Sequence, residues 1–229
     1  MLNELILPAA LSVLLLVYSV AANLLPPKLQ AATYVPLNLA VSVLLIAWAY
    51  KGAGLSLAQI GIRLDTAKNS AVWGLFLGLA IGLPTFLVIC LARPRLGIAA
   101  TSEAASIASL SQLLIRILIM IPLGTVVLEE IAFRGVLPQL FLRGLSQPVA
   151  ILMANLVFGA WHIGLYVRTM GLAKPPAQSS IAGFALLALA AIMGGILMGL
   201  LRSRTANLIG PMIAHWIINA LAVIALSLS

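Results

Sequence analysis

The sequence predicts an all-α protein, a polytopic membrane bundle of seven to eight transmembrane helices. Of its 229 residues, 63% are hydrophobic and only 8% are charged, whereas an ordinary soluble domain has about 25% charged residues. The apolar residues gather in runs close to the length of about 20 residues that a helix needs to cross a bilayer. Because these runs are too long and too continuous for barrel strands, a helical bundle is the expected architecture.

The expected helices follow one another with short connections. Proline and glycine groups such as Pro26-Pro27 and Pro175-Pro176 separate them. The expected ranges are 5–25, 34–50, 70–91, 109–128 with a helical continuation at 129–143, 148–166, 181–201 and 207–227. We expect one integral-membrane domain over residues 1–229, in which the part from about 109 to 227 carries the motifs described below.

The segment 55–69 differs from the spans because its apolar residues alternate with polar and charged ones. Leu57, Ile60 and Leu64 are interspersed with Arg63 and Asp65. Such a pattern favours a short amphipathic segment lying along the membrane interface.

The net charge of +8 does not indicate a nucleic-acid-binding protein in so apolar a chain. The thirteen Lys and Arg residues are spread over short loops, where they predict interfacial anchors and contacts with anionic lipids. Membrane lipids are therefore expected partners, and nucleic acid is not. The loop charges divide nearly evenly between the two sides, so they predict no orientation.

Few ionisable residues fall within the apolar runs, and these are concentrated in three segments. Glu129 and Glu130 directly follow an apolar run, and both histidines of the chain, His162 and His215, lie within predicted helices. A charge at the bilayer centre costs from about 3 to more than about 10 kcal/mol, so such residues are candidates for function.

Helical spacing separates the two glutamates. Glu130 and Arg134 are four residues apart with the acid first, which favours an ion pair. Because successive residues differ by about 100° around a helix, Glu129 and Glu130 are not expected to face one small site. Glu129 is then the unpaired carboxylate, free to act as a base, while Glu130 and Arg134 support the site.

Two further helices each present a polar face. Asn155, Phe158 and His162 share one face of the helix at 148–166, with Trp161 expected to point elsewhere as a packing or lipid-facing aromatic. On the last helix, His215 and Asn219 are four residues apart and also share a face. Asn219 is expected either to donate to an oxyanion or to orient His215.

Three chemistries fit these groups. In the first, Glu129 and a histidine activate water, while the other histidine and Asn219 stabilise the oxyanion of peptide hydrolysis. In the second, Glu129, His162 and His215 ligate zinc. In the third, the same groups relay protons or bind an ion in a transporter. There is no HExxH sequence, which excludes the common zinc-protease helix.

Three ordered motifs resemble those of the CPBP family, the CAAX protease and bacteriocin-processing (Abi) intramembrane proteases. Glu-Glu-x-x-x-Arg is met by residues 129–134, Phe-x-x-x-His by Phe158 and His162, and His-x-x-x-Asn by His215 and Asn219. Together the motifs span residues 129–219, and no motif position departs from the pattern.

The resemblance implies an intramembrane endopeptidase that cleaves near the membrane surface. By analogy Glu129 is the general base, and His162, His215 and Asn219 complete the catalytic group, with Phe158 in a supporting position. The implied substrate is a peptide or a membrane-associated protein, with or without a lipid modification, and the implied location is a bacterial inner or plasma membrane. No cofactor is favoured, although zinc remains an alternative. The family also leaves open a non-enzymatic immunity or scaffold role.

Overall fold

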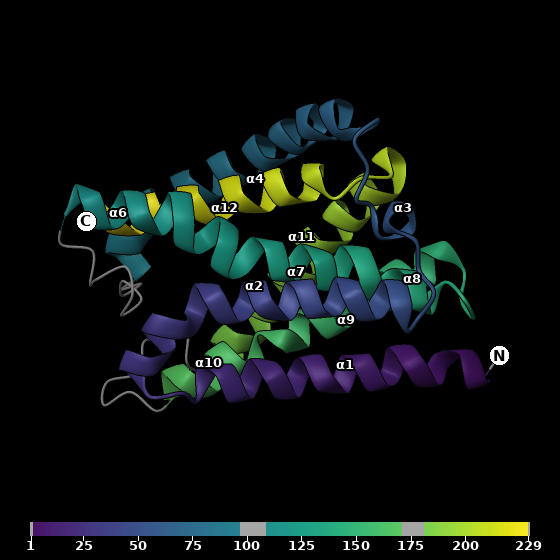
Figure 1. Ribbon diagram of the computed structural model, residues 1–229. Helices are drawn as coiled ribbons and strands as arrows, with labels where there is room; N and C mark the ends of the chain where they lie inside the picture. The colour runs from purple at the N-terminus through teal and green to yellow at the C-terminus, as the bar shows by residue number, and fades with distance from the viewer. Residues whose placement is uncertain (1, 97–108, 171–180, 229) are drawn as a thin grey trace.

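The computed structural model describes residues 2–96, 109–170 and 181–228, and these residues form an all-helical bundle (Figure 1). Seven of the described helical segments are long and apolar enough to cross a membrane. The predicted fold class is therefore confirmed, with seven spans rather than eight among the described residues. The helices are α1 (Leu2–Asn23), α2 (Pro27–Lys51), α3 (Leu57–Ile60), α4 (Ala67–Leu96), α6 (Leu110–Ile115), η1 (Arg116–Val126), α7 (Val127–Glu130), η2 (Ile131–Val136), α8 (Leu137–Phe141), α9 (Gln147–Trp161), α10 (Ile163–Met170), α11 (Ile181–Thr205) and α12 (Ile209–Ser227).

The described residues form seven spans and not eight because the fourth span is continuous. The expected helix at 109–128 and its continuation at 129–143 join without a break, so that Leu110–Phe141 forms one span of 32 residues. The second span also differs from its prediction, because it begins at Pro27 instead of near residue 34. A proline is tolerated at the first helical position, where its missing N–H would have no partner in any case.

The segment 55–69 contains one short helix of its own, the single turn α3, and its last residues are the start of α4, which begins at Ala67. A capping box between Ser56 and Gln59 begins α3, and Gly61 ends it with a left-handed φ of 97°. Ile60 is fully buried, whereas Leu64 is 95% exposed. The segment is thus a loop pinned to the core by one helical turn, and Leu208 N–H donates to the carbonyl of Gly61 to hold it there.

Helices α4 and α12 lie side by side and their backbones touch (Figure 1). A Cβ added to Gly74 would lie 2.2 Å from the carbonyl oxygen of Gly210, and one added to Gly78 would lie 3.0 Å from the Cα of Ala214. Gly74, Gly78 and Gly82 repeat every four residues, the small-residue spacing that lets membrane helices approach closely. This seam fixes the position of α12, which carries His215 and Asn219.

The seam predicts that Gly74→Ala destabilises the protein. The added methyl would meet backbone atoms of α12, which have no side-chain freedom with which to move aside. We expect a loss of about 1 to 3 kcal/mol, measured as a lower thermal midpoint of the detergent-purified chain. Gly194→Ala is the matched control, since nothing lies within 4 Å of its added Cβ. There alanine is expected to be neutral or slightly stabilising, and equal midpoints for the two variants would contradict the seam.

Candidate active site

The acidic residues lie where the fourth span changes its winding. Val127–Glu130 is a single α-helical turn between two π-helical stretches, η1 and η2, in which N–H groups bond five residues back, as Val127 does to Pro122. Pro122 contributes to this change because it offers no N–H to an α-helical bond. π-Helical turns are rare and often occur at functional sites. They also shift side chains away from the positions that an α-helix with 3.6 residues per turn would give them.

Glu130 forms the predicted ion pair with Arg134. The Arg134 Nη1 atom donates to Glu130 Oε1 over 3.0 Å, and both side chains are 0% exposed. The same oxygen accepts a second bond, over 2.7 Å, from Nδ1 of His215. Glu130 therefore orients the ring of His215. This is one of the two roles predicted for Asn219.

Glu129 faces the other nitrogen of the same imidazole. Its Oε2 atom lies 3.7 Å from His215 Nε2, and its Oε1 atom accepts a 3.0 Å bond from the indole Nε1 of Trp161. The side chains of the two glutamates diverge as helical geometry requires, and only Glu129 lines the cavity described below. Both nevertheless contact His215, which presents one ring nitrogen to each.

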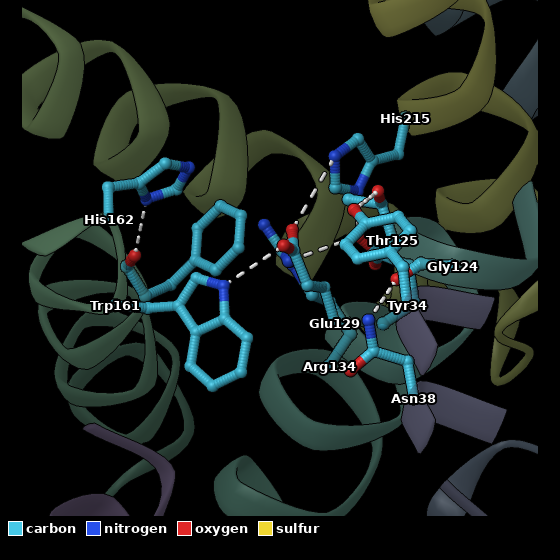
Figure 2. Close-up of polar contacts among 11 residues, drawn as sticks. Tyr34, Asn38, Gly124, Thr125, Glu129, Arg134, Trp161, His162 and His215 are labelled. Carbon is cyan, nitrogen blue, oxygen red and sulfur yellow. Dashed lines mark hydrogen bonds and ion pairs between the residues drawn. The ribbon is translucent and has the colours of Figure 1, made fainter. Parts of the chain in front are cut away.

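Trp161 was placed wrongly, since it points at Glu129 and not away from the site (Figure 2). Trp161 is the last residue of α9 and lies three residues after Phe158, so helical spacing itself places these two side chains on one face. The next residue, His162, is the C-cap, and the helical wheel no longer determines where its side chain points. The indole also stacks on Tyr18 at 6.0 Å between ring centroids, which fixes the plane in which its N–H lies.

His162 is held by its own helix. Its Nδ1 atom lies 2.9 Å from the carbonyl oxygen of Phe158. A carbonyl can only accept, so Nδ1 carries the proton and Nε2 offers its lone pair. The Phe158 ring stands edge-on to both imidazoles, 5.1 Å from His162 and 6.2 Å from His215, and Arg134 lies 4.1 Å above its centre. Phe158 therefore separates the two histidines and covers the buried guanidinium.

The four residues predicted to be catalytic line one cavity of about 520 Å³. Glu129 comes from the fourth span, His162 from the end of α9, and His215 and Asn219 from α12. Glu129 is the only carboxylate among the described lining residues. Among the described residues the Asn219 amide has no hydrogen-bond partner. Glu129, in contrast, accepts a bond from Trp161, and His215 is bonded to Glu130.

A polar cluster from α2 completes the wall beside Glu129 and was not found in the sequence. Tyr34 hydroxyl shares a 2.5 Å bond with Thr125, and the Asn38 amide donates to the carbonyl of Gly124 over 2.5 Å (Figure 2). Gly124 leaves room for the ring of Tyr34, since a Cβ there would lie 2.5 Å from Tyr34 Cε1. Single hydroxyls and amides in an apolar helix carry no sequence signal for such long-range pairing.

The zinc alternative can be tested against this geometry. Among the described residues, no three His, Cys, Asp or Glu side chains are placed to hold a metal ion together. The Nδ1 atoms of His215 and His162 are held by Glu130 and by the Phe158 carbonyl, contacts that would also orient a metal-ligating imidazole and that leave its Nε2 free. Because Glu129, His162 and His215 are not gathered around one point, the set does not fit a zinc centre in this arrangement, and we derive no step through a metal.

Comparison with protein families matches residues 111–221 to the type II CAAX prenyl endopeptidase Rce1-like family. The matched segment runs from α6 into α12 and contains all three motifs. Comparison with curated proteins and with solved structures finds no match.

Proposed function

Because residues 111–221 match the type II CAAX prenyl endopeptidase Rce1-like family, we propose that this integral membrane protein hydrolyses a peptide bond with water activated by Glu129. The observation that supports this most strongly is the cavity shared by Glu129, His162, His215 and Asn219. Three helices bring these groups together, as a site for acyl transfer requires of its base and its oxyanion donors.

Glu129 takes the proton from water in this proposal. One of its oxygens is bonded to Trp161, which leaves Oε2 to accept the proton. The 3.7 Å gap between Oε2 and His215 Nε2 is too long for a direct hydrogen bond, and a polar gap of this length suits a bridging water. His162, whose Nε2 lone pair is free of the Phe158 carbonyl, orients that water from the other side of the cavity.

Asn219 stabilises the oxyanion through its amide N–H, and His215 does so through Nε2–H in its doubly protonated form, with Nδ1–H held by Glu130. They lie four residues apart on α12 and so reach the cavity from the same face. Glu130 and Arg134 hold the His215 ring and so act as positioning residues. Donors that are already oriented before the reaction stabilise developing charge more effectively than groups that must first turn toward it.

Trp161→Phe tests the position of the base. Phenylalanine keeps an aromatic ring beside Tyr18 and Phe133 but removes the N–H that holds Glu129 Oε1. Since a hydrogen bond to a charged group contributes about 1.5 to 3 kcal/mol, we expect kcat to fall by about tenfold or more, with KM little changed. Trp73→Phe is the matched control, because Trp73 is exposed on α4, 56% accessible. Equal kinetics in the two variants would remove Trp161 from the site.

The proposed substrate is the C-terminal part of a membrane-associated, prenylated protein. The cavity supplies leucines for an apolar chain, including Leu25, Leu165 and Leu187, and the cation Arg168 for a peptide carboxylate. The test is hydrolysis by the purified chain in proteoliposomes of one peptide with and without a prenylated cysteine. We expect cleavage of the prenylated peptide at least about tenfold faster. No cleavage of either peptide would contradict the proposal.

The same assay tests whether the reaction needs a metal. We expect no loss of rate in a chelator and no stoichiometric zinc in the purified protein, because the proposed base acts on water directly. A rate that falls in chelator and returns with zinc would instead support the set Glu129, His162 and His215.

Proton-coupled transport is a weaker alternative, and one observation favours it. Polar contacts run from Glu129 through His215 and Glu130 to Arg134. A proton wire along this path would have to pass through Arg134, and an arginine does not release its proton in a protein. The contacts are therefore better suited to fixing His215 than to conducting protons.

A further inference from the structure

A second cavity, of about 240 Å³, lies on the opposite side of the Glu130–Arg134 ion pair from the catalytic cavity. It is bounded by α3, η2, α8, the first half of α9 and the end of α11. Its polar lining consists of two arginines, Arg134 and Arg202, with the uncharged side chains Gln59, Gln139, Gln147, Asn155 and Ser203. None of the described lining residues is a carboxylate. The lining thus offers the positive charge of two arginines and several side-chain amides and contains no carboxylate, although Asn155 presents its unpartnered Oδ1 acceptor because its Nδ2 donates to Ile151.

Arg134 presents one unoccupied edge. Nη1 is bonded to Glu130, but the Nε and Nη2 atoms are buried without a hydrogen-bond partner. These two atoms form the edge of the guanidinium whose N–H bonds are parallel, the geometry that binds two oxygens of a single oxyanion. Because the face of the group is covered by Phe158, the edge is the part left for a ligand.

Arg202 adds a second cation that the described residues do not neutralise. Its Nη2 atom donates to the carbonyl of Gln59 over 2.6 Å, and its Nε atom is buried without a partner. The residue is 8% exposed. Gly61 leaves the space for this side chain, since a Cβ there would lie 2.4 Å from Arg202 Nε. An uncompensated buried cation is costly, and a bound anion offsets that cost.

The absence of a side chain at Gly195 keeps the arginine edge accessible. A Cβ at this position would lie 2.7 Å from Arg134 Nη2 and 2.1 Å from Asn155 Oδ1. Neighbouring Gly194 has open space around it instead. Of these two adjacent glycines, only Gly195 lies next to the unpartnered atoms Arg134 Nη2 and Asn155 Oδ1.

We propose that this second cavity is a binding site for a phosphate group. The paired N–H edge of Arg134, the charge of Arg202 and the surrounding amides and hydroxyl match a tetrahedral oxyanion with several acceptor oxygens. Gln147 is the first residue of α9 and Ser203 lies two residues before the end of α11, so the cavity is at the ends of the spans. Basic pockets between membrane helices bind phospholipid headgroups, and the same chemistry serves free phosphate.

The experiment uses the full chain in maltoside micelles, a detergent without a phosphate group, and measures the thermal midpoint. Inorganic phosphate is titrated in one arm, and phosphatidylglycerol is added to the micelles in the other. A ligand that binds only the folded state raises the midpoint with its concentration. A rise with phosphate identifies a free anion, and a rise with phosphatidylglycerol alone identifies a headgroup. No rise in either arm overturns the proposal.

Three variants locate the effect, and two of them have a matched control. Gln147→Glu places a carboxylate in the lining at the exposed first position of α9, where the helix dipole favours it and little loss of stability is expected. Arg202→Gln is matched by Arg204→Gln, because Arg204 does not line the cavity. Gly195→Ala, which places a methyl against Arg134 Nη2, is matched by Gly194→Ala, which has open space around it. We expect about tenfold weaker binding in the three variants and unchanged binding in both controls. Wild-type binding in Gln147→Glu and Arg202→Gln would overturn the assignment.

Discussion

Glu129→Gln is expected to lower the rate of peptide hydrolysis by a factor of about 10² to 10⁴, the contribution typical of a general base. Glutamine has the shape of glutamate, and its carbonyl oxygen can still accept the Trp161 N–H, so the wall of the cavity is retained. What is lost is the atom that takes the proton from water. The measurement is kcat and KM on the prenylated peptide, and the change is expected in kcat.

The control for this variant is Glu4→Gln, the same substitution at an exposed position of α1 outside the cavity. It is expected to behave as the wild type in both kinetics and thermal midpoint. Hydrolysis in Glu129→Gln within a factor of about two of wild type would exclude Glu129 as the base. A comparison of membrane-peptide fragments in cells that carry wild type or Glu129→Gln extends the same test to natural substrates.

Arg134→Met is expected to have the largest effect on stability. The substitution removes the Nη1 donor and leaves the Glu130 carboxylate, 0% exposed, with His215 as its remaining partner. Breaking a buried ion pair in this way costs about 3 to 5 kcal/mol. For a chain of this length the thermal midpoint then falls by on the order of 10 °C. Arg204→Met, on the exposed side of α11, is expected to change the midpoint little.

The double variant Glu130→Gln with Arg134→Met separates stability from positioning. With the carboxylate neutralised, the buried site no longer holds an unpaired charge, so much of the lost stability is expected to return. Activity is not expected to return with it, because His215 has lost the anion that accepts its Nδ1 proton. If both stability and kcat recovered together, Glu130 would be a packing residue with no part in orienting the histidine.

The positions of the spans could be predicted closely because bilayer thickness fixes the length of an apolar run. The errors arose where local geometry overrides that rule. Pro26-Pro27 indicated a gap, but Pro27 begins α2. The glycine repeat Gly74, Gly78 and Gly82 is a sequence signal for close helix packing, but it does not identify the partner helix.

The ion pair between Glu130 and Arg134 could be predicted because both partners lie on one helix, and the four-residue spacing places them together. The bond from Trp161 to Glu129 joins positions 32 residues apart on two different helices, and the periodicity of one helix carries no information about such a contact. The contact of both glutamates with His215 depends on the packing of α12 against the fourth span, which no spacing along the chain encodes. Residue types identified the candidates, and tertiary packing decided which atoms meet.

The glycine seam has a consequence for the tolerance of the catalytic geometry. None of the described residues of α4 lines the cavity, but α4 is the support on which α12 rests. A methyl group at Gly74 or Gly78 would displace α12, and with it both His215 and Asn219, by a fraction of the group's own size. A misplacement of about 1 Å, even from a distant substitution, can lower a rate by about 10²-fold. Gly74 and Gly78, which lie outside the cavity, therefore determine where the oxyanion donors His215 and Asn219 are placed in it.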